Sequence, residues 1–408
     1  MFWNRREKQK LTLNKKTMKK ILFLFVIIIN LFACKKVDNI EKLDNPVINY
    51  FYNDADTIGA TLTIIGLNFS KVNKNNIVVF NATEATPYYS SNDTLMVIIP
   101  ENATTGLIAV QVYSKSDTSK NIFYVVTGRW HQKTSIPIGR FEAVGFSLGN
   151  NGYIGTGTGY SDYLQDFWGF DPLKDTWTKK SNFQGGLRRE AVSFVISGKA
   201  YVGCGTNTQT FSEANDFYEY DSSGETWVRK ADPGIYLDNA VGLSINGKGY
   251  IITGDYSNEV LEYNPQNNIW TKKKDFPGVS RSSASGFVIG NKGYIFGGNS
   301  GGSPDLRDLW EYDPVYDEWS RKADLNGIFR GYEAVGFSLN GKGYVGNSNG
   351  SFKQFWEYNP LTNTWIRKTN FPSNSLGYSS SFVINNKAYV VGGVISNDVS
   401  NEVWEFVP

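Results

Sequence analysis

The sequence predicts an all-β protein in which a small sandwich precedes a six-bladed β-propeller. Gly is frequent (41 residues) and aromatic residues make up 15% of the chain, which suits short strands and tight turns. No amphipathic helical stretch is visible after residue 40. Tryptophan recurs at intervals of 47, 50, 43, 49 and 46 residues, which indicates one strand-and-turn unit copied in an array whose members pack on each other. The recurring residues are Trp130, Trp177, Trp227, Trp270, Trp319 and Trp365.

The first residues change how the charge of the chain is interpreted. The formal net charge is +2, but residues 1–33 hold eight Lys and Arg residues and one acid, which leaves 33 bases and 38 acids in the rest of the chain. Binding of nucleic acid requires a basic stripe, and a mildly acidic chain lacks one. We therefore expect no nucleic-acid partner.

Residues 1–33 are expected to be a signal peptide, and residues 1–17 a possible start-site extension before Met18. Lys19 and Lys20 precede an apolar run at residues 21–32, which is too short to span a bilayer and is typical of an export signal. The run ends in Leu31-Phe32-Ala33-Cys34, which resembles the lipobox of bacterial lipoproteins. That resemblance implies a lipidated Cys34, a tether at residues 34–45 and an outer-membrane protein anchored by lipid alone. The alternative is a plain secretory signal.

The sequence contains few residues that are suited to redox or metal chemistry. Cys204 is the only cysteine besides Cys34, so no disulfide forms within the mature chain, and we expect a buried, inert thiol. His131 is the only histidine and lies near the N-terminal end of the tryptophan-repeat region, so we expect no Ser-His-Asp triad and no metal site built on several histidines. We therefore expect neither a cofactor nor a metal.

Residues 46–127 lack the tryptophan repeat and form a domain of their own. Short alternating or β-branched runs are expected to be strands at residues 62–65, 77–80, 95–99, 107–113 and 122–126. Six or seven such strands suggest a sandwich. The stretches ATLTIIGLNFS (60–70), NIVVFN (76–81) and DTLMVIIP (93–100) resemble the IPT/TIG domain, which implies an immunoglobulin-like fold and a spacer role, with a second binding site as the alternative.

Residues 128–408 contain six copies of one unit. Each copy has a first strand, a Gly-Lys-Gly-Tyr-like second strand, a Trp-x-Tyr-Asp-Pro-like third strand and a closing Trp, and this pattern resembles Kelch repeats. The galactose-oxidase-like Kelch superfamily implies a propeller, here without the copper site. The last copy lacks its fourth strand while Trp130 has no blade before it, so we expect the strand near residues 129–133 to complete the last blade and leave no open edge.

Small residues recur within the first strand of each unit. They alternate with bulky ones, which places them on one face of the innermost strand, where the six strands crowd around the axis. The positions are Ala143, Ala191, Ala240, Ala284, Ala334 and Ser379, and two residues later Gly145, Ser193, Gly242, Gly286, Gly336 and Ser381.

Polar residues precede these small positions and are our candidate ligand site. The longer connections on the same face, at residues 158–166, 206–215, 299–308 and 347–354, are further candidates. Arginine suits bidentate recognition of carboxylates, and a buried glutamate can act as a general base. The alternative is that these residues pair with each other or with nearby backbone to order each blade. The candidate residues are Arg140, Arg188, Arg281, Arg330, Glu142, Glu190, Glu333, Asn239 and Tyr378, with Ser283 at the remaining position.

Two functional classes remain open from the sequence. The first, which we favour here, is a non-catalytic and monomeric cell-envelope lipoprotein whose propeller binds a glycan or a surface protein. The second is a sugar mutarotase or epimerase acting on an acidic sugar such as sialic acid, because six-bladed Kelch-like sialic acid mutarotases exist; Glu142, Glu190 and Glu333 would then be catalytic. Fold alone does not decide between them.

Overall fold

The computed structural model describes residues 44–207, 212–302, 306–326, 329, 331–346, 353–374, 377–395 and 398–408. The expected signal peptide, Cys34, most of the tether and Arg330 lie outside these residues. Within them the secondary structure is β-strand, apart from one 3₁₀ turn at Asn73–Asn75, so the all-β prediction is confirmed. No helix in the described part has the length and apolar character needed to cross a membrane.

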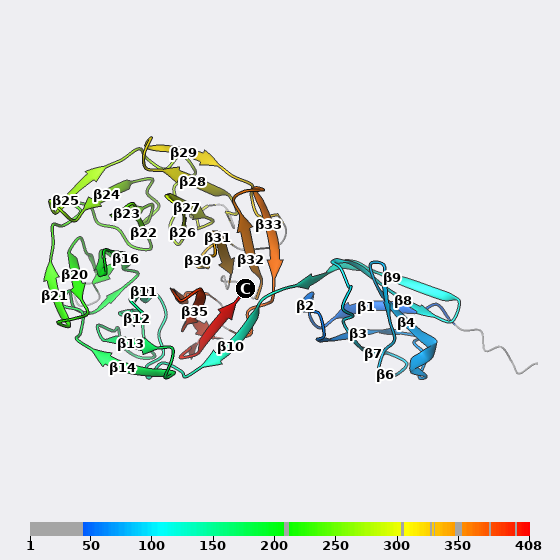
Figure 1. The fold of residues 1–408 in the computed structure, drawn as a ribbon. Helices are drawn as coiled ribbons and strands as arrows, with labels where there is room; N and C mark the ends of the chain where they lie inside the picture. The colour runs from blue at the N-terminus through cyan, green and yellow to red at the C-terminus, as the bar shows by residue number, and fades with distance from the viewer. Residues whose placement is uncertain are drawn as a thin grey trace, which may run out of the picture.

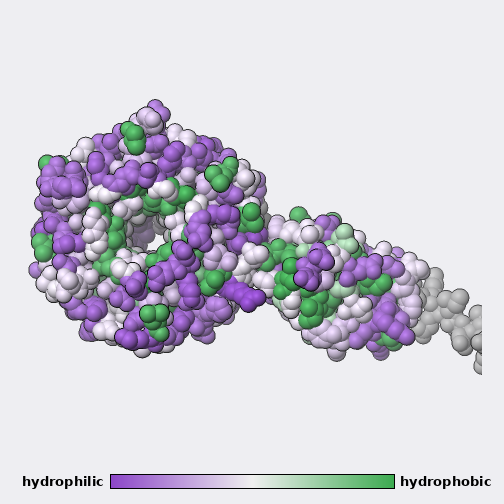
Figure 2. All heavy atoms as spheres, in the orientation of Figure 1, coloured by the Kyte–Doolittle hydropathy of each residue, from purple (hydrophilic) through white to green (hydrophobic). Residues whose placement is uncertain are grey.

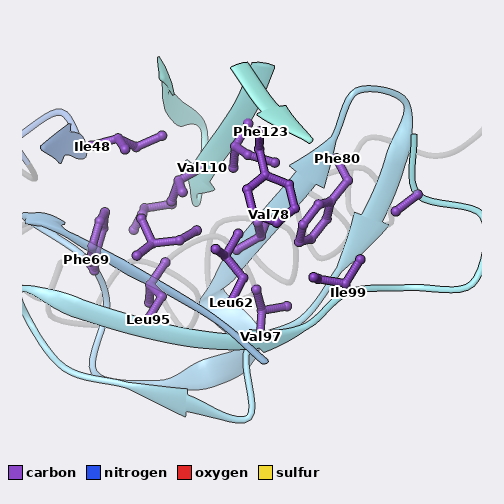
Figure 3. Close-up of a cluster of buried hydrophobic side chains, with 14 residues drawn as sticks. Ile48, Leu62, Phe69, Val78, Phe80, Leu95, Val97, Ile99, Val110 and Phe123 are labelled. Carbon is purple, nitrogen blue, oxygen red and sulfur yellow. The ribbon is translucent and has the colours of Figure 1, made fainter. Parts of the chain in front are cut away.

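The first domain is a sandwich of two sheets. One sheet has the strand order β1-β3-β7-β6, and the other has the order β2-β9-β8-β4-β5. Their inward side chains form one buried cluster that includes Leu62, Val78, Phe80 and Phe123 (Figure 3). The strands are β1 (Val47–Phe51), β2 (Ala55–Thr57), β3 (Thr61–Leu67), β4 (Asn76–Phe80), β5 (Thr83–Ala85), β6 (Tyr89–Ser90), β7 (Thr94–Ile98), β8 (Gly106–Val112) and β9 (Lys115–Val126).

The second domain is a ring of six four-stranded antiparallel sheets (Figure 1). Blade one has β11 (Val144–Leu148), β12 (Asn151–Gly155), β13 (Phe167–Asp171) and β14 (Thr176–Lys180). Blade two has β16 (Val192–Ile196), β17 (Lys199–Gly203), β20 (Phe217–Asp221) and β21 (Thr226–Arg229). Blade three has β22 (Val241–Ile245), β23 (Lys248–Ile252), β24 (Val260–Asn264) and β25 (Ile269–Lys272).

Blade four has β26 (Ser285–Ile289), β27 (Lys292–Phe296), β28 (Leu309–Asp313) and β29 (Glu318–Arg321). Blade five has β30 (Val335–Leu339), β31 (Lys342–Gly346), β32 (Phe355–Asn359) and β33 (Thr364–Lys368). Blade six has β34 (Ser380–Ile384), β35 (Lys387–Val391) and β38 (Val403–Val407), and β10 (Arg129–Lys133) is its fourth strand. Short strands in the connections are β15 (Arg188–Arg189), β18 (Thr206–Asn207), β19 (Ser212–Glu213), β36 (Val394–Ile395) and β37 (Asp398–Val399).

The ring closes as the sequence predicts. Strand β10 pairs antiparallel with β38, with Trp130 opposite Phe406 and His131 opposite Glu405. The Trp130 ring packs against Phe355, Phe371 and Phe406 at centroid distances of 4.8–5.0 Å. Its indole N–H donates to the carbonyl of Thr369, 239 residues away. The five other repeat tryptophans make the same kind of bond to the segment before their own blade, so each fastens one blade to the next.

The innermost strands begin just after a left-handed turn. In blade one, β11 begins at Val144 because Glu142 has φ 55°, outside the extended region. The predicted small residues line the axis. A Cβ atom on Gly242 would lie 2.4 Å from the Ser193 carbonyl oxygen, so the neighbouring blade leaves no room for a side chain there.

The sandwich rests on the outer edge of blade five (Figure 1). The Arg367 guanidinium donates to the Asp54 carboxylate at 3.4 Å and lies 5.5 Å from the Trp356 ring, which in turn packs edge-on against Tyr124. Lys368 donates to the Thr127 hydroxyl at 2.6 Å. Arg367 and Lys368 are buried, whereas Arg321, at the matching position of blade four, is exposed. The two domains therefore share a specific polar interface.

Candidate functional site

One turn of backbone repeats at the start of every blade and encircles the axis. The six residues at this turn have φ between 49° and 58°, the left-handed region that side chains other than glycine seldom adopt. Each residue donates its backbone N–H to the carbonyl of its counterpart in the preceding blade, at 3.0–3.2 Å. We call Glu142, Glu190, Asn239, Ser283, Glu333 and Tyr378 the mouth ring.

The mouth ring surrounds the opening at the centre of the propeller (Figure 2). The cavity there has a volume of about 260 Å³ and is lined by the mouth ring and by the small residues of the innermost strands. The structure therefore brings together Glu142, Glu190, Asn239, Ser283, Glu333 and Tyr378, as the sequence led us to expect.

The arginines expected at the same mouth lie elsewhere. The side chains of Arg140, Arg188 and Arg281 are completely buried. Each makes a two-pronged bond to one carboxylate and donates to a backbone carbonyl: Arg140 to Asp166 and Thr156, Arg188 to Asp216 and Cys204, and Arg281 to Asp308 and Gly297. The prediction that these arginines lie at the mouth is wrong, because these bonds hold each guanidinium inside its own blade.

A pairing within the sequence marks these arginines as structural. The partner aspartate directly precedes the third strand and is present in the same three blades that have the arginine. Blades three and five have Leu237 and Gly331 at the arginine position, and there the residue before the third strand is Glu259 or Gln354. This joint presence of Arg and Asp was a signal that we did not use.

Arg189 contacts two acids of the mouth ring, and sequence reasoning missed it. Its guanidinium lies 3.6 Å from the Glu142 carboxylate and 3.7 Å from that of Glu190, and the side chain is 35% exposed. The Nε atom of Arg189 makes no hydrogen bond within the described part of the chain. Because Glu190 adopts the left-handed turn, residue i−1 faces the mouth while residue i−2, Arg188, enters the blade.

Glu142 and Glu190 form a buried acidic pair beside Arg189. Their side chains are 8% and 10% exposed, and they accept hydrogen bonds from the hydroxyls of Thr158 and Thr206 at 3.3 Å. Burial and the neighbouring Glu190 carboxylate raise the pKa of Glu142 to about 8, although Arg189 opposes the shift. Glu142 therefore holds a proton at neutral pH, in a site that also offers an acceptor and a cation.

Further acids lie beyond Glu190 on the side of blade three. The Thr206 hydroxyl lies 3.4 Å from the Asp238 carboxylate as well as 3.3 Å from that of Glu190. Burial and Glu190 raise the pKa of Asp238 to about 6, and burial and Asp255 raise that of Glu213. This side of the mouth is rich in groups that accept hydrogen bonds from hydroxyls.

On the side away from Glu190, the neighbour of Glu142 in the mouth ring is the aromatic residue Tyr378. Tyr378 lines the cavity and donates its hydroxyl to Glu333, and burial together with that bond raises the pKa of the phenol. Its ring meets Phe141 edge-on at a centroid distance of 5.9 Å. The mouth is therefore asymmetric, with Arg189 and most of the acids on blades one to three and aromatic rings at the seam between blades six and one.

The described residues were compared with the needs of a metal site and of a reactive thiol. Among them, no group of three or more His, Cys, Asp or Glu residues is placed to hold a metal ion. Cys204 is completely buried, and burial raises the pKa of its thiol to about 12, so this thiol stays protonated. His131 lies on β10, away from the cavity residues.

Comparison with known families supports the two-part organisation. Residues 46–125 match the profile of the IPT/TIG domain, and residues 280–326 match that of the Kelch motif. Both resemblances drawn from the sequence are thereby confirmed.

Several curated relatives carry the same name, N-acetylneuraminate epimerase. The protein from Haemophilus influenzae is 30% identical over 128 residues, which are 29% of this chain and 32% of the relative. The protein from Yersinia enterocolitica is 28% identical over 134 residues (31% and 33%), and that from Pasteurella multocida is 25% identical over 193 residues (36% and 49%). The chain thus spans between a third and a half of the length of these relatives.

A solved structure shares the fold of the propeller. It is described as the structure of YjhT, and it aligns with a TM-score of 0.59 at 17% identity, covering 66% of this chain and 95% of the other. At this identity the likeness concerns the fold alone.

Proposed function

We propose, for a chain that joins an IPT/TIG sandwich to a Kelch-type propeller, that the mouth ring binds an acidic sugar and interconverts its two anomers. The observation that carries the proposal is the cluster of Glu142, Glu190 and Arg189 at the opening of the axial cavity. Curated relatives named N-acetylneuraminate epimerase support the choice of substrate class. This reverses the preference that the sequence alone suggested.

Interconversion of anomers needs one proton donor and one proton acceptor. Ring opening of a cyclic hemiketal removes the proton of the anomeric hydroxyl, breaks the bond between the anomeric carbon and the ring oxygen, and delivers a proton to that oxygen. Rotation of the new carbonyl group and the reverse steps give the other anomer, so no redox partner or metal is consumed. General acid and base side chains held near the reacting atoms accelerate such steps.

The three residues fit these roles. Glu142 holds a proton at neutral pH and donates it to the ring oxygen. Glu190, which accepts a hydrogen bond from Thr206, takes the proton of the anomeric hydroxyl. Arg189 is a third exposed and binds the sugar carboxylate, since a guanidinium forms two parallel bonds to a carboxylate.

The test is an exchange measurement on the protein from residue 44 to 408. Magnetisation transfer between the anomeric signals of N-acetylneuraminate reports the interconversion rate without net reaction. We expect acceleration by the wild type and a loss of at least about a hundredfold in Glu142→Gln and Glu190→Gln. Glu225→Gln is the matched control, because Glu225 lies in an outer turn and pairs with Lys180.

Non-catalytic binding of a glycan is the second candidate, and the extra sandwich domain favours it. Binding of the sugar without acceleration by the wild type would select this candidate. If the wild type neither binds the sugar nor accelerates the exchange, the mouth ring is not a sugar site.

We further propose that the protein is anchored to the outer membrane through a lipid on Cys34. The lipobox-like sequence before Cys34 supports this. Labelling of growing cells with an alkyne fatty acid is expected to mark the wild type and not Cys34→Ala, and an unlabelled wild type would contradict the anchor.

A further inference from the structure

Two aromatic side chains stand directly beside the acidic pair, at the seam where the first blade meets the last. Phe141 precedes Glu142 in the chain, and Tyr378 precedes Glu142 in the order of the mouth ring. Their rings meet at a centroid distance of 5.9 Å and an angle of 68°, and both side chains are half-buried. We call this pair the aromatic wall.

Both rings are held in place by bonds at their own backbones. The Phe141 N–H donates to the Thr158 carbonyl at 3.0 Å, and the Thr158 N–H returns a bond of 2.8 Å. The Thr158 hydroxyl in turn donates to the Glu142 carboxylate. Phe141 is therefore tied to the same short segment that orients the proposed acid.

Tyr378 is fixed at both ends of its side chain. Its N–H donates to the Glu333 carbonyl at 3.2 Å, and its carbonyl accepts from Glu142 at 3.1 Å. Its hydroxyl donates to the Glu333 carboxylate. A ring held in this way loses little freedom when a ligand packs against it.

No other pair of neighbouring positions around the described mouth offers such a surface. Moving around the ring, the residues preceding the mouth ring are Arg189, Asp238 and Ser282 in blades two to four, and the mouth ring itself has Asn239 and Ser283 in blades three and four. Blade five contributes Tyr332, which lies close enough to Tyr378 to affect its ionisation. Among the mouth ring and the residues directly before it, aromatic side chains therefore occur on blades five, six and one.

We propose that the aromatic wall is the subsite on which the apolar C–H face of a cyclic sugar lies while its carboxylate is bound by Arg189. A pyranose presents such a face, whereas a small acyclic keto acid does not, and aromatic rings pack well against apolar edges. The wall therefore selects cyclic acidic sugars and holds the anomeric carbon beside Glu142. This inference rests on the proposed function of the mouth ring and adds the determinant of its specificity.

The test separates binding from turnover. Saturation-transfer NMR measures the affinity of the 44–408 protein for N-acetylneuraminate and for pyruvate, and the exchange measurement gives KM and kcat. Phe141→Leu and Tyr378→Leu are expected to weaken sugar binding and raise KM about fivefold to tenfold, with little change in kcat. Pyruvate binding should not change. Tyr378→Phe keeps the ring but loses the bond to Glu333 that fixes it, so its KM should lie between those of the wild type and Tyr378→Leu.

Tyr316→Leu is the matched control, because Tyr316 lies in the turn between β28 and β29, outside the cavity lining, and is 74% exposed. Unchanged sugar affinity in both Leu variants, with melting temperatures equal to that of the wild type, would overturn the wall while leaving the proposed reaction intact. Equal weakening of sugar and pyruvate would also overturn it. If the wild type binds the sugar but does not accelerate exchange, the proposed reaction is wrong. The sugar affinities of the two Leu variants would still test the aromatic wall.

Discussion

The backbone N–H of Glu142 donates a 3.1 Å hydrogen bond to the carbonyl of Tyr378, and this bond joins the first blade of the propeller to the last. The two residues are 236 positions apart in the chain, yet they are adjacent in the mouth ring. The proposed acid and its aromatic neighbour meet only when the propeller is closed. Opening of the ring between the first and last blades would therefore also separate these two residues of the site.

The closing strand is expected to be essential for a stable monomer. A protein that starts at residue 127 keeps β10, whereas one that starts at residue 134 exposes the edge of β38, which β10 covers in the intact chain. We expect the longer protein to be monomeric and the shorter one to aggregate or to unfold at a lower urea concentration. Light scattering after gel filtration and urea titration measure this. Equal behaviour of the two proteins would show that β10 is dispensable.

Arg188 and Arg189 are adjacent in sequence and are expected to differ in effect. Arg188→Ala leaves the Asp216 carboxylate without its buried partner and should lower the free energy of unfolding by about 3–5 kcal/mol. Arg189→Ala should cost less than about 1 kcal/mol, because that side chain is a third exposed, and should abolish binding of the acidic sugar. Urea titration and calorimetry measure the two quantities. A stable Arg188→Ala protein that has lost sugar binding would restore the ligand role first expected of Arg188.

The ionisation of Glu142 is expected to make stability depend on pH. The pKa of Glu142 is about 8 in the folded protein and 4.5 in the unfolded chain, so between these values the folded state binds more protons and stability falls as pH rises. Glu142→Gln removes this loss and should be more stable than the wild type by about 1–3 kcal/mol at pH 9, with a smaller difference at pH 4. Urea titrations at pH 4, 7 and 9 measure it, with Glu225→Gln as control. A difference that does not change with pH would show that Glu142 is not protonated in the folded state.

The rate of anomer exchange should also depend on the protonation of Glu142. The exchange rate is expected to fall as pH rises through about 8, because Glu142 then loses the proton that it donates. A rate that stays constant up to pH 10 would exclude Glu142 as the acid.

The contact between the domains is expected to contribute to stability at one blade only. Arg367→Ala removes the bonds to Asp54, to Asn370 and to two backbone carbonyls and should destabilise the protein by about 1–3 kcal/mol. Arg321→Ala, at the matching position of blade four, should change stability by less than about 0.5 kcal/mol. Thermal unfolding of both variants measures this, and spin labels on the two domains report whether their distance distribution broadens. Equal effects of the two variants would mean that the interface contributes nothing.

The fold could be predicted because its signals repeat. The interval between tryptophans set the number of blades, the unpaired Trp130 identified the closing strand, and the alternation from Ala143 to Gly145 identified the axis. Each signal reflects packing that is the same in every blade, so six copies confirm one another. The sandwich was predicted more coarsely, since short strands such as β5 and β6 leave little trace in the sequence.

The site was predicted only in part, because one turn changes which residue faces the axis. Extended geometry places residues i and i−2 on the same face, and this led us to Arg188 rather than Arg189. The left-handed conformation of Glu190 breaks that rule, and a non-glycine residue in this region is hard to foresee from sequence. Glu142, Glu190 and Tyr378 lie at the mouth as expected, because they occupy the turn itself.

The mouth ring separates the size of the opening from its chemistry. Its diameter is determined by six peptide-to-peptide bonds, which any residue able to adopt the turn can make, whereas its selectivity depends on the six side chains. Substitution at these positions can therefore change which chemical groups face a ligand while the six backbone bonds stay in place. In a propeller of this kind, the backbone frame and the ligand preference depend on different atoms of the same six residues.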